Sequence, residues 1–164
     1  MAVYPIPMLP RQNYHHGGIA FRGTSKYRGD RIHAACDLVV PAGTPVYAVE
    51  KGKVLKVPKT AFHLGTYTIT IQHPNFIIRY AEVAQARFVN EFDEVAEGQQ
   101  IGTVGRNNNG GAMLHFEMYS GAASGSLSQP WNQSKYIHVK PGNFQRRKDL
   151  LDPTPYLDSW SMWL

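Results

Sequence analysis

The chain has 164 residues, 43% of them hydrophobic, which fits one globular domain of residues 1–164 with a continuous core. Its single cysteine, Cys36, excludes an internal disulfide. The net charge of +5 favours an anionic partner, or simply keeps the protein soluble. Apart from Arg146-Arg147-Lys148 the basic residues are dispersed and no nucleic-acid-binding motif accompanies them, so we expect no nucleic acid partner.

Residues 1–32 are rich in Pro, Gly, Tyr and Arg without any sustained period, which predicts an irregular segment lying over the domain. The first ten residues lack the charged start and the apolar run of a signal peptide, and no stretch approaches the ~20 apolar residues of a membrane helix. We therefore expect a protein made in the cytoplasm without a signal peptide and not inserted into a membrane. His15-His16 could bind a metal, but adjacent loop histidines are more often exposed to solvent.

From His33 onward the sequence is typical of short β-strands. Runs of β-branched and aromatic residues alternate with Gly, Pro and Asn turns at intervals of about 8–12 residues, which predicts an all-β sandwich or barrel. The expected strands are residues 38–40, 46–49, 53–57, 66–71, 76–80, 100–105 and 113–119.

Beyond residue 120 the composition is that of loops as far as residue 144. A short helix is expected from about 145 to 151, because Asp152-Pro153 would stop it there. A second helical turn is expected at 155–160. The fold is therefore predicted to carry loop-rich extensions at both ends.

Three side chains are candidates for binding a metal ion. His33 and Asp37 stand four residues apart, and His115 lies in an apolar run far along the chain. Side chains alternate along a strand, so His115 should face away from the core residues Leu114 and Phe116. Two imidazole nitrogens and one carboxylate oxygen suit a catalytic zinc ion, which keeps a fourth position for water. A structural histidine in the core is the simpler interpretation of His115 considered alone.

The order of the motifs around these residues resembles the M23 metallopeptidases, which are the lysostaphin-like peptidoglycan endopeptidases. The resemblance covers about residues 30 to 120, and the ordered set is far more specific than a His-x-x-x-Asp pair alone. After His33 and Asp37 come Pro-Ala-Gly-Thr-Pro-Val at 41–46, Gly-Lys-Val at 52–54, Gln-Ile-Gly at 100–102 and Leu-His-Phe-Glu at 114–117.

This resemblance implies an antiparallel sheet or open barrel of the lysostaphin type, with a groove for a cell-wall peptide and with zinc held by His33, Asp37 and His115. Zinc would polarise the carbonyl of the bond to be cut and lower the pKa of water to about 7. The implied protein is a zinc-dependent endopeptidase that cuts peptide stems or cross-links of peptidoglycan. It would act in the periplasm or on the wall of a target bacterium, as a phage lysin or as an effector with an immunity or delivery protein.

Two departures mark the chain as a divergent member. Where the family has a histidine at the start of its last motif this chain has Met113, and the family's Tyr-x-His reads Tyr80-Ala81-Glu82. Glutamate can accept a proton, so we predict Glu82 as the general base. Strand alternation would put it on the same side as Tyr80, facing the groove. A surface glutamate at a strand end is the alternative.

Other roles stay open in the sequence. Tyr80 and Asn109, the latter in the loop 106–112, are predicted to bind substrate. The group that stabilises the oxyanion could be His73, Tyr80, His138 or a tyrosine or arginine from residues 14–31. Cys36 is interpreted as a small buried residue. The missing histidines also allow a degenerate M23 domain that binds the cell wall or activates another hydrolase.

Overall fold

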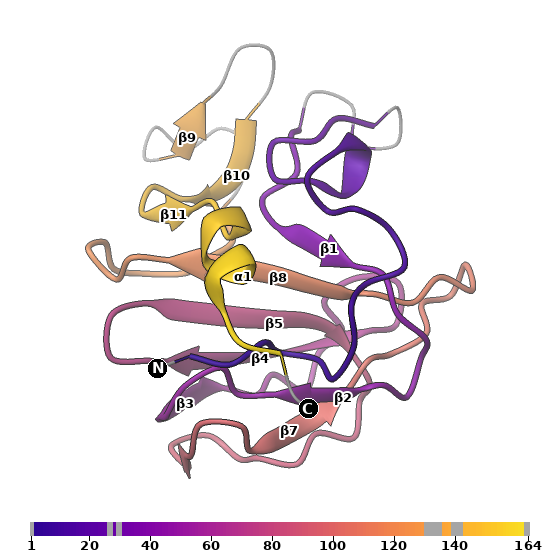
Figure 1. Ribbon diagram of the computed structural model, residues 1–164. Coiled ribbons are helices and arrows are strands. Elements are labelled where there is room, and N and C mark those ends of the chain that lie inside the picture. Colours follow the sequence, from indigo (N-terminus) through magenta and orange to yellow (C-terminus); the bar gives the residue numbers. More distant parts are fainter. Residues whose placement is uncertain (1, 26–27, 29–30, 130–135, 139–142, 163–164) are drawn as a thin grey trace.

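The computed structural model of the chain describes residues 2–25, 28, 31–129, 136–138 and 143–162. Within these residues the main element is a seven-stranded antiparallel sheet (Figure 1). Its order is β1 (Cys36–Leu38), β8 (Leu114–Tyr119), β5 (Ile77–Val83), β4 (Tyr67–Gln72), β3 (Gly52–Lys56) and β6 (Glu94–Val95), with β11 (Leu150–Leu151) also pairing with β8.

Two smaller sheets complete the β structure. One pairs β2 (Pro45–Tyr47) with β7 (Gln100–Thr103), and the other pairs β9 (Tyr136–His138) with β10 (Asn143–Arg147). Among the described residues the helices are the 3-10 turn η1 (Gly17–Ile19) and α1 (Thr154–Ser159), and none is long and apolar enough to cross a membrane. The prediction of an all-β fold with antiparallel sheets is confirmed.

The helix expected at 145–151 is wrong, because these residues form β10 and β11. The buried Arg146 binds the carboxylate of Glu117, and Arg147 binds that of Asp149. Such tertiary contacts override the weak local preference for helix. The short helix α1 lies near the turn that was expected at 155–160.

The core lies on one face of the central sheet. Tyr80 of β5 and Phe116 of β8 pack edge to face there, with ring centroids 5.6 Å apart, and Trp160 lies 5.9 Å from Phe116. The helix α1 and the N-terminal segment cover this face together, and Val3 forms a parallel bridge with Ser161 (Figure 1). The irregular N-terminal segment is thus packed into the core.

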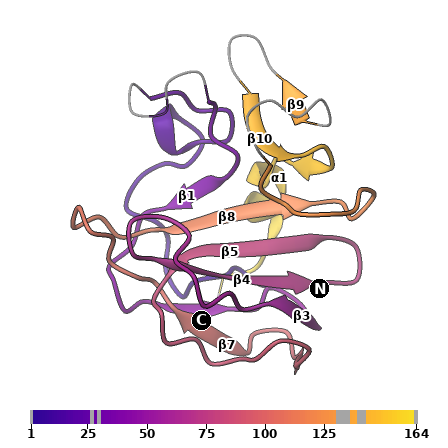
Figure 2. The same ribbon diagram turned by 180° about the vertical axis from the view of Figure 1, so that it is seen from behind.

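The opposite face of the same strands carries polar side chains. Strand pairing places Asp37 of β1 directly beside His115 of β8, and His115 beside Ala81 of β5. Seen from behind, the connection between β3 and β4 crosses this face (Figure 2). The ring centroid of Phe62, in that connection, lies 4.8 Å from the guanidinium carbon of Arg79. Phe62 therefore covers part of this polar face.

Candidate metal centre

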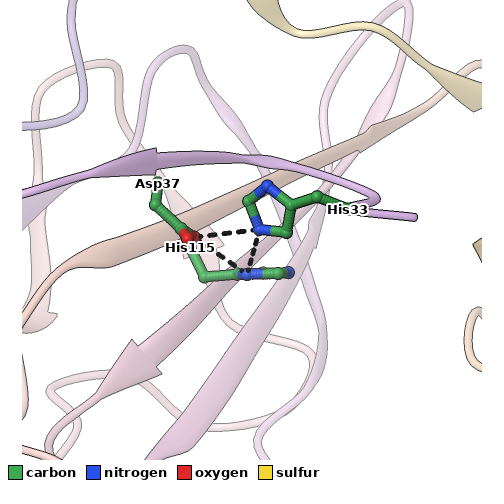
Figure 3. Close-up of side chains that lie close together, drawn as sticks. All are labelled: His33, Asp37 and His115. Carbon is green, nitrogen blue, oxygen red and sulfur yellow. Dashed lines mark hydrogen bonds and ion pairs between the residues drawn. The ribbon is translucent and has the colours of Figure 1, made fainter. Parts of the chain in front are cut away.

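The polar face brings together the three side chains that the sequence singled out (Figure 3). His33 Nε2 lies 3.2 Å from Asp37 Oδ1 and 3.4 Å from His115 Nδ1, and His115 Nδ1 lies 3.1 Å from Asp37 Oδ1. All three residues are buried. Ligand atoms about 2.0–2.2 Å from a tetrahedral zinc ion are separated from one another by roughly 3.3–3.6 Å. The observed spacing therefore fits one small metal ion after a slight expansion.

The far nitrogens of the two imidazoles are held by hydrogen-bond acceptors. His33 Nδ1 donates to the carbonyl oxygen of Ala20 at 3.0 Å, and His115 Nε2 donates to Glu117 Oε1 at 2.7 Å. In the neutral form of both imidazoles, a proton on each far nitrogen leaves the lone pairs of His33 Nε2 and His115 Nδ1 pointing toward Asp37. This is the way in which histidine ligands of metal ions are usually oriented.

Asp37 and His115 shift each other's pKa. Burial favours the neutral form of Asp37, but the neighbouring His33 and His115 outweigh it and hold the carboxyl pKa below its usual range. Burial likewise opposes charge on His115, but its hydrogen bonds with Asp37 and Glu117 raise the imidazole pKa to about 9. A metal ion entering the cluster would have to displace a proton from His115.

Glu117 holds the His115 imidazole in place through the hydrogen bond at its Oε1. Its fully buried carboxylate accepts hydrogen bonds from Arg79 Nε at 3.0 Å, from Arg146 Nε at 3.0 Å and from the Tyr119 hydroxyl at 2.7 Å. Burial would raise its pKa, but the two guanidinium charges lower it well below the ordinary value. Sequence reasoning missed this role, although Glu117 stands two residues after His115 on the same strand face.

Glu82 reaches the cluster through a β-bulge. In the pairing of β4 with β5, Thr68 lies opposite Ala81 and Tyr67 lies opposite Val83, so Glu82 is an extra residue. Its φ of 61° is in the left-handed region. Such bulges redirect a side chain, and Glu82 Oε2 lies 3.8 Å from His115 Nδ1.

The surroundings of Glu82 favour a carboxyl group that can change its protonation near neutral pH. Burial is the main cause that raises its pKa to about 7, opposed by the charge of His115 and assisted by that of Asp37. Asn107 also forms a hydrogen bond with Glu82. Asn107 Oδ1 accepts the backbone N–H groups of Asn109 and Gly111 at 2.9 and 3.0 Å, so its amide nitrogen is the donor toward Glu82.

The expected position of Tyr80 is wrong. Its side chain is fully buried on the core face, where its hydroxyl accepts the Val49 N–H at 3.1 Å and donates to His73 Nε2 at 2.9 Å. The bulge reverses the alternation after Tyr80, so Tyr80 and Glu82 point to opposite faces. Neither Tyr80 nor His73 is among the residues that line the pocket.

Asn109, Cys36 and His15 are not among the residues that line the pocket. Asn109 is exposed at the tip of its loop, and its predicted contact with substrate stays a prediction; Asn107 lines the pocket instead. Cys36 is buried with its Sγ 3.4 Å from Thr154 Oγ1. His15 pairs with Asp158 at 2.8 Å. The side chain of His138 lies outside the described part of the chain.

The three candidate ligands and Glu82 line one pocket of about 400 Å³. Met113 lines it too, at the position where the family has a histidine. Arg28 and Arg31 from the N-terminal segment and Phe62 form other parts of its wall. The pocket therefore joins a potential metal site, a buried carboxyl group and several cations in one space.

Known proteins are similar to this chain in sequence and in fold. The chain is 37% identical over 89 residues to peptidoglycan DD-endopeptidase ShyC of Vibrio cholerae. The matched region covers 53% of this chain and 20% of that protein. A zinc-containing peptidase from Vibrio cholerae superposes with a TM-score of 0.57 at 29% identity, over 72% of this chain and 36% of the other. Lysostaphin from Staphylococcus simulans has the same fold, with a TM-score of 0.63 at 20% identity, over 97% of this chain and 56% of the other.

The chain thus spans about a fifth of the length of the first of these relatives. The model of peptidase family M23 matches residues 31–130, which is more than half of the 164 residues and includes all three candidate ligands and Glu82. On this evidence, the chain belongs to peptidase family M23.

Proposed function

We propose that the protein is a zinc-dependent endopeptidase that hydrolyses peptide stems or cross-links of bacterial peptidoglycan, with residues 1–164 acting as one domain. The observation that carries this proposal is the convergence of His33 Nε2, Asp37 Oδ1 and His115 Nδ1 within 4.8 Å of one another beside a buried carboxyl group. The peptidoglycan DD-endopeptidase relative supports the substrate class. Its substrate also supports action at the cell wall.

The donor set fits zinc, because two imidazoles and one carboxylate leave a fourth position free for a reacting molecule. A zinc ion held there supplies Lewis-acid polarisation of a carbonyl group and a lowered pKa for water. His33 and His115 serve as neutral ligands, because Ala20 and Glu117 accept the protons on their far nitrogens.

Glu82 performs the proton transfers in this proposal. Its carboxylate takes a proton from the attacking water and delivers it to the nitrogen of the leaving amine. A pKa of about 7 lets the group exist in both forms at neutral pH, which is the condition for efficient general acid–base catalysis. The Asn107 amide, fixed by Asn109 and Gly111, holds the carboxylate in place.

Digestion of purified cell wall tests the proposal. Wall incubated with the zinc-loaded protein should release fragments with new amino and carboxyl ends, which mass analysis identifies together with the bond that was cut. Chelation should stop the release and added zinc should restore it. If no new ends form under any metal condition, the enzymatic proposal is wrong.

A second candidate is a catalytically degenerate M23 domain that binds the cell wall or activates another hydrolase. The observation that favours it is Met113, whose thioether in the pocket cannot transfer protons where the family has an imidazole. Wall binding without release of new ends, or stimulation of a second hydrolase, would favour this candidate.

A further inference from the structure

One part of the pocket wall carries two arginines, and the carboxylate charges of Asp37 and Glu82 act on one of them, Arg28. Arg28 and Arg31 both line the pocket, and neither forms an ion pair with any described carboxylate. Arg28 Nη1 is buried and has no hydrogen-bond partner among the described residues. A buried guanidinium nitrogen without an acceptor is costly unless a ligand supplies one.

The other charges around the pocket have partners. The guanidinium groups of Arg79 and Arg146 both bind Glu117. Asp37 and Glu82 carry the negative charge that a divalent metal ion would balance. With the metal in place, the charges of Arg28 and Arg31 have no described counterpart, so this part of the pocket stays positive.

Like charges crowd there as well. Burial is the main cause that lowers the pKa of the Arg31 guanidinium, and the charges of Arg146 and Arg28 lower it further. Three arginines therefore line one small pocket, where Arg146 is already paired with Glu117 and the described acids of the wall are Asp37 and Glu82 of the candidate site. An anion in this space would relieve the repulsion among these arginines.

We propose that Arg28 and Arg31 form a binding site for a carboxylate of the substrate peptide, next to the bond that is cut. This inference rests on the proposed function and specifies its substrate as a peptide that carries a free carboxylate beside the cleaved bond. A carboxylate suits the site because guanidinium groups bind it with paired, charge-assisted hydrogen bonds.

The size of the pocket fixes how near this carboxylate must lie. A pocket of about 400 Å³ is at the small end of the ~300–1,000 Å³ found for ligand sites. His33, Asp37, His115 and the two arginines line this same pocket. The bound carboxylate therefore belongs to a residue adjacent to the bond over the metal, and a substrate with an amide in its place should be cut poorly.

A matched pair of substrates tests the site. One is a soluble cross-linked wall fragment with free carboxylates, and the other is the same fragment after its carboxylates have been converted to amides. The native protein should cut the free acid about 10- to 100-fold more efficiently, the range expected for hydrogen bonds to a charged group. Arg28→Gln and Arg31→Gln should remove this preference by raising KM for the acid more than KM for the amide.

Two controls separate this effect from others. Arg11→Gln removes the same charge from an exposed position that does not line the pocket, and it should keep the preference. Arg31→Lys keeps the charge without the paired donors, and it should fall between the native protein and Arg31→Gln. A loss of kcat that is equal for acid and amide would overturn the proposal, because it would show that the arginines serve the reaction and not a substrate carboxylate.

A binding measurement distinguishes failure of this site from failure of the proposed function. Acetyl-D-alanyl-D-alanine and its C-terminal amide are titrated into the isolated protein and followed by NMR. Tighter binding of the acid, lost in Arg31→Gln and kept in Arg11→Gln, supports the carboxylate site even if no wall is cleaved. Equal binding of acid and amide, or no binding of either, overturns it.

Discussion

Two side chains on strand β5, Tyr80 and Glu82, stand two residues apart and lie in opposite environments. On the core face the Tyr80 hydroxyl connects His73 Nε2 and the Val49 N–H, and His73 Nδ1 donates to the carbonyl oxygen of Lys51 at 3.0 Å. Each donor in this series of hydrogen bonds has one acceptor. The arrangement is neutral and complete, which marks it as structural.

On the other face, Glu82 joins His33, Asp37 and His115, and the balance is different. Acceptor atoms converge there, and a proton on His115 holds the place that a cation would take. The residue types on the two faces are similar. A structural histidine therefore differs from a potential metal ligand in whether its neighbours satisfy the hydrogen-bonding capacity of both ring nitrogens.

The largest expected effect concerns Glu82. Glu82→Gln keeps the size and the bulge but cannot accept a proton, so turnover on wall fragments should fall by about 10²–10⁴-fold. Zinc content should not change, because the three ligands remain. Tyr80→Phe on the other face is the matched control and should leave turnover nearly intact. Unchanged turnover in Glu82→Gln would remove Glu82 from the mechanism.

Glu117 links the metal site to the buried arginines. Glu117→Gln would leave Arg79 and Arg146 without their carboxylate, so the free energy of unfolding should drop by about 3–5 kcal/mol, as when one partner of a buried ion pair is removed. Denaturant unfolding measures this loss. Glu94→Gln, at an exposed position, is the control. A drop no larger than that of the control would show that Glu117 does not anchor the cluster.

The contribution of His73 to the free energy of unfolding should depend on pH. Burial lowers the pKa of His73 from 6.5 to about 4, so between these values the unfolded chain takes up a proton that the folded chain does not. Its contribution to stability is therefore complete above pH 6.5 and is lost as the pH falls toward 4. The loss should be on the order of 3 kcal/mol.

Thermal or denaturant unfolding of the native protein and of His73→Asn across this range measures that contribution. The difference between the two proteins isolates His73 from the other groups that titrate. If both stability curves fall in parallel, His73 is not the neutral, buried group described above.

The smallest effect concerns the backbone. A non-glycine residue at φ 61° is strained, so Glu82→Gly should raise the free energy of unfolding by about 1 kcal/mol. Ala81→Gly, at the preceding position of the regular strand, should instead destabilise the fold. Destabilisation by Glu82→Gly would indicate that the bulge is not strained.

The sequence was informative where a pattern repeats. Alternating strands and the turns between them predicted the all-β fold, and the ordered motifs brought His33, Asp37 and His115 to attention before their proximity was known. The helix at 145–151 failed because the local pattern holds no sign that Arg146 is drawn to Glu117.

The position of Glu82 shows the limit most clearly. Strand alternation grouped it with Tyr80, and only the bulge, an extra residue with positive φ, turns it to the other face. No glycine marks the bulge in the sequence. Arg28 and Arg31 were likewise hidden in an irregular segment, where no period predicts which side chains reach the pocket.

Metal content tests the central claim most directly. The native protein and Asp37→Ala are incubated with zinc, dialysed against metal-free buffer and analysed for zinc per chain. The geometry predicts about one zinc ion per native chain and none in the variant. Zinc absent from the native protein, or bound equally by Asp37→Ala, would contradict the assignment of His33, Asp37 and His115 as a metal site.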